Sequence, residues 1–243
     1  IPEQRITGGT LHLVVVESRI GSVKVKPGCY FSYNELERWI ACTRPGMRIY
    51  EPNIENDLLW LNQNPFRRVG VDFKKGSLPG TTDVIYSSTD VRPLRGYIGA
   101  DDTGVKSLNY GRLFAGFTYG NLFGRGGILG YQYTGDDEFS RLQAHALSYT
   151  QPLNRSWSAQ GNGSWAGVTP QMLPGFDQHG ESWQTSAGLV RNIVRSQHEN
   201  AALTMGVDFK STNNNLEFSG QRVSDSTADL LQLRLGYNHF LRL

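Results

Sequence analysis

The sequence predicts a chain of two parts, in which a small α+β module precedes a longer all-β antiparallel region. Three observations lead to this fold class. The 243 residues include 28 glycines, more than the ~17 expected from the usual share of about 7%. Charged residues make up only 19% of the chain, whereas aromatic residues reach 11%. Helix signals occur only before residue 93, and period-two alternation dominates after it.

The first part, residues 1–92, begins with a strand and a short helix. The β-branched run Thr10–Val16 predicts a strand that continues through Ile20–Val25. Ser32 and Glu35 form a capping-box pattern, which predicts a helix start. The apolar residues that follow at helical spacing are Leu36, Trp39 and Ile40.

A second helix and two strands complete the module. Pro52, which suits the first position of a helix, predicts a second helix over Asn53–Asn62. Phe66–Phe73 alternates in the manner of a strand, and Thr82–Thr89 is a third strand after a Pro-Gly turn. The predicted order is therefore β-α-α-β-β, with two helices covering a three-stranded sheet.

The second part, residues 93–243, predicts about eight strands of ~9–11 residues each, with uncharged polar side chains on one face and apolar side chains on the other. Opposite the polar face lie Trp157, Trp165 and Trp183. This pattern is typical of an outer-membrane barrel with a wet lumen and aromatic girdles. The residues expected to line the lumen are Ser158, Gln160, Asn162, Ser164, Ser182, Gln184 and Ser186.

Turn signals separate the strands. Tight turns are expected at 121–124 and 151–154, and longer polar loops at 101–107, 135–138, 167–180 and 213–226. Short links on one side and long loops on the other are usual for outer-membrane barrels.

Composition excludes several functions. No apolar run reaches the ~18 residues of a membrane-spanning helix. The net charge of +2 is evenly spread, which argues against nucleic acid as a partner. No phosphate loop, metal-ligand spacing or catalytic motif occurs, so we expect no enzyme activity, no catalytic residue, no metal, no nucleotide and no other cofactor.

Several motifs, in order and spread over nearly the whole chain, resemble the two-partner secretion transporters, the haemolysin and adhesin secretion-activation proteins of the outer membrane. Their second polypeptide-transport-associated (POTRA) domain is similar to residues 1–92, and the first half of their sixteen-stranded barrel is similar to residues 93–243. No single motif is specific. The matching segments are Ile1–Gln4, Gly9–Gly21, Leu61–Pro65, Leu78–Asp83, Arg92–Pro93, Gly99–Gly104, Gly120–Gly124 and Leu235–His239.

The resemblance implies a fragment of a Gram-negative outer-membrane translocator with its POTRA domain in the periplasm. Its partners would be membrane lipid and an unfolded secreted protein, either an adhesin, a haemolysin or a contact-dependent toxin. Two alternatives stay open. One is an outer-membrane protein insertase of the same superfamily, and the other is a soluble β-rich binding or adhesion protein.

The resemblance also places the second strand at an edge of the small sheet, where it can accept an extended client by β-augmentation. The expected client-binding residues are Arg67, Val69, Val71, Phe73, Leu36 and Ile40. The alternative is that the apolar members of this set simply form the core of the module, and edge pairing through the backbone holds in either case. Cys29 and Cys42 either form one disulfide or stay separate thiols.

Overall fold

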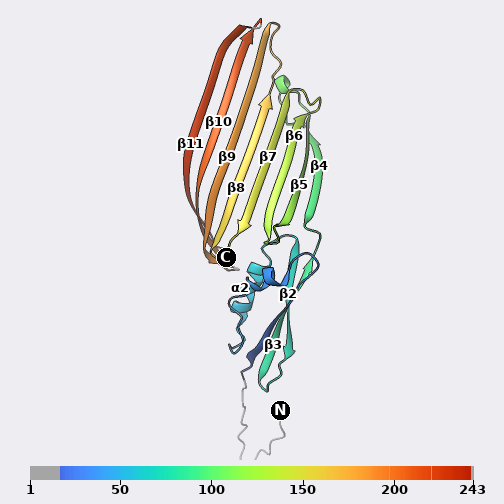
Figure 1. The fold of residues 1–243 in the computed structure, drawn as a ribbon, viewed down its shortest axis with the longest axis vertical. Coiled ribbons are helices and arrows are strands. Elements are labelled where there is room, and N and C mark those ends of the chain that lie inside the picture. Colours follow the sequence, from blue (N-terminus) through green and yellow to red (C-terminus); the bar gives the residue numbers. More distant parts are fainter. Residues whose placement is uncertain (1–16, 197, 220, 242–243) are drawn as a thin grey trace, which may run out of the picture.

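The computed structural model describes residues 17–241 except 197 and 220, and within these residues it contains two β-sheets that share no strand. Figure 1 shows the smaller sheet and its helices at one end of the long strands of the larger sheet. The predicted division into a mixed first part and an all-β second part is visible in the order of the elements.

The smaller sheet has the strand order β1-β3-β2, in which β3 pairs in parallel with β1 and antiparallel with β2. The elements follow the predicted β-α-α-β-β order, and the expected strand Thr10–Val16 lies outside the described residues. Their bounds are β1 (Arg19–Lys26), α1 (Tyr33–Glu37), α2 (Glu51–Leu61), β2 (Arg67–Lys75) and β3 (Thr81–Asp90).

Local sequence accounts for both helix starts. The Ser32 hydroxyl accepts a hydrogen bond from the backbone N–H of Glu35, as an N-cap does. A capping box also needs the Glu35 side chain to bind the backbone N–H of Ser32. This part of the prediction is wrong, because the Glu35 carboxylate pairs with Arg67 in the interior. α2 begins one residue before Pro52, which lies in its first turn, where the missing N–H costs little.

One apolar cluster holds the smaller sheet and the helices together. The indole rings of Trp39 and Trp60 stack with centroids 5.9 Å apart. Because such a small domain has little interior, each of these large side chains carries much of its stability. The cluster consists of Ile20, Phe31, Leu36, Trp39, Ile54, Trp60, Leu61, Phe66, Val69, Val84 and Tyr86.

Two aspartates organise the loops of the small domain. Asp57 accepts hydrogen bonds from the backbone N–H groups of Ala41, Cys42 and Thr43 at 2.8–3.1 Å. The Asp90 carboxylate accepts three more from the loop after β1, at residues 29–31. A carboxylate that accepts several N–H groups replaces the ladder partners that an irregular segment lacks.

The larger sheet is an antiparallel meander of eight strands, in which each strand pairs with its sequence neighbours. Its bounds are β4 (Leu94–Asp101), β5 (Arg112–Leu122), β6 (Gly127–Asp136), β7 (Leu142–Pro152), β8 (Trp157–Val168), β9 (Phe176–Arg195), β10 (Glu199–Phe218) and β11 (Gln221–Leu241), with a single 3-10 turn η1 (Lys106–Leu108). The eight strands form an open sheet, because β4 and β11 are its two edges.

The lengths of the last three strands differ from the prediction. β9, β10 and β11 contain 20, 20 and 21 residues, about twice the expected length. The predicted loop at 213–226 is therefore largely strand, and half of the predicted loop at 167–180 is strand. These extensions carry polar residues on both faces, so they show no alternation that the sequence could reveal.

The connections before β10 alternate in length as expected, but the last one at the far end, between Phe218 and Gln221, is short where a long loop was expected. Links at 123–126 and 153–156 lie at the end next to the small domain, and longer links at 102–111, 137–141 and 169–175 lie at the far end (Figure 1). The two tight turns fall two residues later than predicted. Phe123, Gly124 and Gly126 adopt positive φ angles of 58°, 65° and 69° in the first of them. Among the described helices, none has the length and apolar character needed to cross a membrane.

Candidate functional site

The seven residues expected to line a lumen share one face of β8 and β9. In the antiparallel register Asn162 lies opposite Ser186, and Ser164 lies opposite Gln184. These four residues line a hollow of about 440 Å³ with polar and small residues of β6 and β7. Ser158, Gln160 and Ser182 lie on the same face and outside this hollow. The structure thus brings the set together on one face, and its role in a pore stays a prediction.

A charged pair on this face was not anticipated. Arg234 lies 3.5 Å from the carboxylate of Asp208, and its guanidinium extends over the backbone of Gly188 and Gly206. A Cβ added at Gly206 would lie 3.1 Å from Nη2 of Arg234. The glycines therefore give a long side chain room to lie flat, a role that their position in alternating strands could have suggested.

The opposite face of the sheet is apolar and aromatic. Tyr133, His145, Trp165 and Trp183 follow one another across neighbouring strands in a single register row. The first three rings are in contact, with centroids 5.1 Å apart for Tyr133 and His145 and 5.7 Å apart for His145 and Trp165. This row has the composition of an aromatic girdle.

A second aromatic position marks the other limit of the apolar face. Trp157 starts β8, and the guanidinium of Arg191 lies 5.6 Å from its ring centroid. Trp157 and Trp165 are eight residues apart on β8, about 26 Å along the strand. At the ~40° tilt of barrel strands this is about 20 Å along the membrane normal, close to the height of the apolar band of outer-membrane barrels.

The six residues expected to bind a client do not form one surface. Leu36 and Val69 are buried in the core of the small domain, and Ile40 and Val71 pack against it half-buried. Phe73 is 51% exposed at the end of the same face of β2. The strand β2 does lie at the sheet edge, as predicted. Among the five apolar side chains, Phe73 is therefore the one that is open to a client.

Arg67, the sixth residue, is committed to the interior. Its Nη1 atom lies 2.5 Å from Glu35 Oε1, and its Nε donates to the Leu61 carbonyl at 2.6 Å. Burial raises the pKa of Glu35 although Arg67 opposes this change, and burial lowers the pKa of Arg67. The side chain of Arg67 thus anchors the start of β2 and is turned away from any client.

The backbone N–H and carbonyl of Val69 point away from β3, and both already have hydrogen-bond partners. Val69 N–H donates to Oδ1 of Asn62 at 2.7 Å, and Nδ2 of Asn62 donates to the Val69 carbonyl at 3.0 Å. Asn62 is the C-cap of α2. Its side-chain amide therefore takes the place of a neighbouring strand at this one position, a feature that no sequence pattern indicated.

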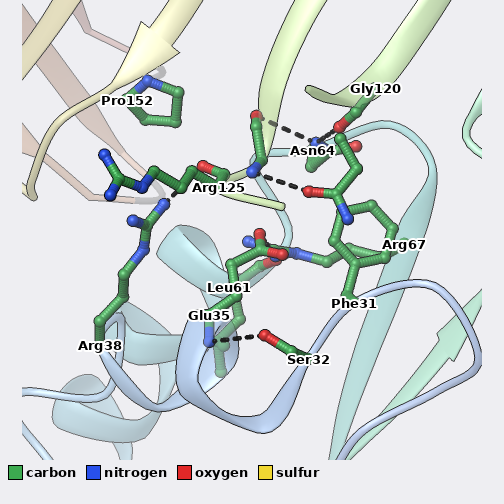
Figure 2. Close-up of polar contacts among 12 residues, drawn as sticks. Phe31, Ser32, Glu35, Arg38, Leu61, Asn64, Arg67, Gly120, Arg125 and Pro152 are labelled. Carbon is green, nitrogen blue, oxygen red and sulfur yellow. Dashed lines mark hydrogen bonds and ion pairs between the residues drawn. The ribbon is translucent and has the colours of Figure 1, made fainter. Parts of the chain in front are cut away.

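The first contact between the small domain and the larger sheet is centred on Asn64. The buried Asn64 amide donates to the carbonyl of Gly120 at 2.5 Å and to that of Gly126 at 3.3 Å. Figure 2 shows Asn64 beside Gly120 and the Arg38 side chain extending to Arg125, whose carbonyl accepts a hydrogen bond at 2.6 Å. Glu35 lies below the same turn, where a Cβ on Gly126 would come within 2.7 Å of its carboxylate.

Two further turns of the larger sheet contact the small domain. In the turn 153–156, Arg155 pairs with the fully buried Asp57 and donates to the Cys42 sulfur at 3.1 Å. At the turn that follows β9, the carbonyl of Arg195 accepts a hydrogen bond from the Asn56 amide at 3.2 Å. The guanidinium of Arg195 lies 4.6 Å from the ring centroid of Trp60. We call these contacts at three successive turns the junction. Cys29 and Cys42 are both free thiols.

Taken together, the two faces and the short turns define a class of protein. A large antiparallel sheet that is polar on one face and carries aromatic girdles on the other is the wall of an outer-membrane β-barrel. The family model described as "Haemolysin secretion/activation protein ShlB/FhaC/HecB" matches residues 80–243. The chain belongs to this family, whose characterised relatives are outer membrane transporters of Gram-negative bacteria.

Similar proteins agree with the family. The "Outer membrane transporter CdiB" of Escherichia coli O6:K15:H31 (strain 536 / UPEC) is 23% identical over 263 residues, which cover 98% of this chain and 41% of that protein. The transporter of the same name from Dickeya dadantii (strain 3937) is 27% identical over 127 residues, covering 51% and 22%. This chain therefore spans less than half the length of these relatives.

Solved structures show the same fold. The structure of CdiB from Escherichia coli has a TM-score of 0.74 at 20% identity, and the match covers 99% of this chain and 45% of that one. BamA from Haemophilus ducreyi lacking POTRA domains 1–3 has a TM-score of 0.62 at 14% identity, covering 91% and 44%. At these identities the likeness concerns the fold alone.

Proposed function

We propose that this chain is part of an outer-membrane translocator that exports an unfolded partner protein, either an adhesin, a haemolysin or a contact-dependent toxin. In this proposal residues 1–92 are a periplasmic POTRA domain, and residues 93–243 are the N-terminal half of a sixteen-stranded barrel. The observation that carries it is the polar face of β8 and β9, which begins at the junction with the small domain.

The chemistry of this face suits the passage of a polypeptide. Hydroxyl and amide side chains such as Asn162, Ser164 and Gln184 can exchange hydrogen bonds with a moving backbone one at a time. Because these side chains are uncharged and the net charge of the chain is only +2, no strong field would hold a client of either sign. The proposal needs no nucleotide, since folding of the partner outside the cell supplies the driving force.

The edge of β2 provides an entry point for the same client. Main-chain groups of an edge strand bind an extended segment whatever its side chains are, so one edge serves a long unfolded partner. The edge lies on the domain that contacts three turns of the larger sheet, and a docked segment is thereby held at a fixed place relative to the polar face.

A pair of neighbouring positions tests the transport path. A photoreactive benzoylphenylalanine replaces either Ser164 on the polar face or Gly163 on the apolar face of the full-length transporter in a secreting Gram-negative host. Both positions are open, since Ser164 is exposed and no atom lies within 4 Å of a Cβ at Gly163. We expect Ser164 to crosslink to a polypeptide that is also recovered outside the cell, and Gly163 to crosslink to lipid.

Equal crosslinking of that polypeptide from both positions would contradict a path along the polar face. Crosslinks from Ser164 to outer-membrane proteins alone, with no secreted product, would support the insertase in place of the translocator. The family match does not favour the insertase or a soluble binding protein.

A further inference from the structure

The paired amide of Val69 defines which part of β2 is free. Antiparallel strands alternate between residues that face the partner strand and residues that face away. Val69 faces away from β3, because both its N–H and its carbonyl bind Asn62. β2 and β3 pair without a bulge, so Val71, Phe73 and Lys75 face away as well.

The start of this outward row is occupied, and its other end is the turn into β3. At the start, the Arg67 N–H donates to the Asn64 carbonyl at 3.3 Å, and the next outward residue, Val69, is held by Asn62. After the strand, Gly76 N–H returns to the carbonyl of Thr81 at 2.9 Å. Within the described residues, no segment pairs with the outward groups of Val71–Lys75.

Asn62 is itself firmly placed. Its backbone N–H donates to the Leu58 carbonyl at 2.9 Å at the end of α2, and two residues later Asn64 is fixed beneath the turn that carries Gly126. Displacing the Asn62 amide breaks two hydrogen bonds, and an incoming strand forms two in return. Because the exchange yields no net hydrogen bond, an incoming strand gains nothing by extending beyond Val71.

We propose that Asn62 is a register stop for the docking edge, which confines an incoming client strand to Val71–Lys75. This inference rests on the proposed function, in which an unfolded polypeptide docks on β2. The client segment is extended and short, and it pairs through three outward residues. Phe73 and the half-buried Val71 lie on one face of β2, so the segment that fits carries an apolar side chain at every second position.

Amide hydrogen exchange of the full chain in detergent tests the stop. The probe is an eight-residue peptide of alternating threonine and valine. In the wild type we expect Val69 to exchange at least tenfold more slowly than Val71 and Phe73 before the probe is added. The probe should then protect Val71 and Phe73 at least tenfold and leave Val69 unchanged.

Variants separate the stop from the docking itself. Asn62→Ala should speed the exchange of Val69 at least tenfold, and the probe should then protect Val69 too. Asn34→Ala, at an exposed position of α1, is the matched control and should behave as the wild type. Val71→Pro removes one outward N–H without breaking a bond to β3, and it should weaken probe binding at least tenfold.

The outcomes are distinguishable. If the probe leaves Val71 and Phe73 unprotected in the wild type, or if β2 pairs with β2 of a second copy, docking on this edge is wrong and the stop falls with it. If the probe protects them but never Val69 in Asn62→Ala, the docking stands and the register stop is wrong. Probes of increasing length provide a further test that needs only the wild type. Their affinity for the chain should stop rising once five residues are paired.

Discussion

Tyr86 shows how a single side chain of the small domain responds to its surroundings. The ring is fully buried, and its hydroxyl lies 2.8 Å from that of Thr43. Burial raises the pKa of the Tyr86 phenol to about 12, because the charged phenolate loses its hydration, while the bond to Thr43 acts in the opposite direction. The folded domain therefore holds this proton more tightly than the unfolded chain does.

We expect the stability that Tyr86 contributes to the small domain to be lost as pH rises from 10 to 12, since the folded pKa of Tyr86 lies above the unfolded one. Tyr86→Phe should abolish this part of the pH dependence and cost ~1 kcal/mol at neutral pH through the unpaired Thr43 hydroxyl. Unfolding by denaturant at several pH values measures both. Tyr50→Phe, at an exposed ring, is the control, and an unchanged slope in Tyr86→Phe would refute the assignment.

At the residue scale, the sequence predicted the local role of a side chain better than its long-range contacts. The role of Ser32 as an N-cap could be predicted, because a cap depends on residues within one turn. Asn62, which directly follows the last residue of α2, gave no sign that it would pair with Val69, because a side-chain amide that pairs with a strand has no fixed sequence spacing. Arg67 was assigned to a client surface because it begins the strand expected at the sheet edge. Its partner Glu35 lies 32 positions away, beyond the reach of a local pattern.

At the scale of elements, the apolar face of β8 and β9 is the clearest sign of a membrane environment. The chain has five tryptophans, of which Trp157, Trp165 and Trp183 lie on this face. Trp39 and Trp60 stack within the small domain instead. Trp183 is 44% exposed, which is unusual for so large an apolar ring in water and normal for one that meets lipid.

Quenching by brominated lipids should report this arrangement. In single-tryptophan variants reconstituted into vesicles, Trp183 and Trp157 are expected to lose at least half of their fluorescence to lipids brominated near the headgroup. A variant that retains only Trp39, with Phe at position 60, should lose less than a tenth. Equal quenching of Trp183 and Trp39 would show that the aromatic face does not contact the membrane.

The strands themselves could be predicted where burial imposes alternation and not beyond it. Trp157 and Trp165 alternate with polar residues because one side of the sheet meets an apolar phase. Past Trp183 toward Phe176, β9 has polar residues on both faces, and main-chain pairing continues the ladder to Phe218 without an alternating apolar face. A period-two test cannot detect such a strand, which explains why β9–β11 were predicted at half their length.

At the scale of the whole molecule, the junction joins the two sheets at three successive turns. Each contact includes a main-chain or side-chain partner that is buried, such as Asn64 or Asp57. No local pattern predicts these contacts, because Arg155 and Asp57 are 98 positions apart. The order of helices and strands within each part could be predicted from the sequence, but the orientation of the two parts relative to each other could not.

Arg155→Ala should loosen the junction. Removing one member of a buried ion pair costs ~3 kcal/mol or more, because the other charge stays desolvated. Spin labels are introduced at Lys74 and Met172 after both native cysteines are replaced by serine. We expect the distribution of distances between the labels to change from narrow to broad. Arg141→Ala, at the far end of the sheet, should leave the distribution narrow. A narrow distribution in Arg155→Ala would mean that the other two turns suffice.

The neighbour-to-neighbour pairing of β4 to β11 also has a kinetic consequence. Every strand meets its partner across a connection of ten residues or fewer, so the sheet can grow one hairpin at a time in the order of synthesis, with little loop entropy to overcome at each step. The most recently added strand is always the template for the next. In the described part of the chain β11 is such an edge strand, and its Leu231, Leu233 and Leu235 continue the apolar face of β10.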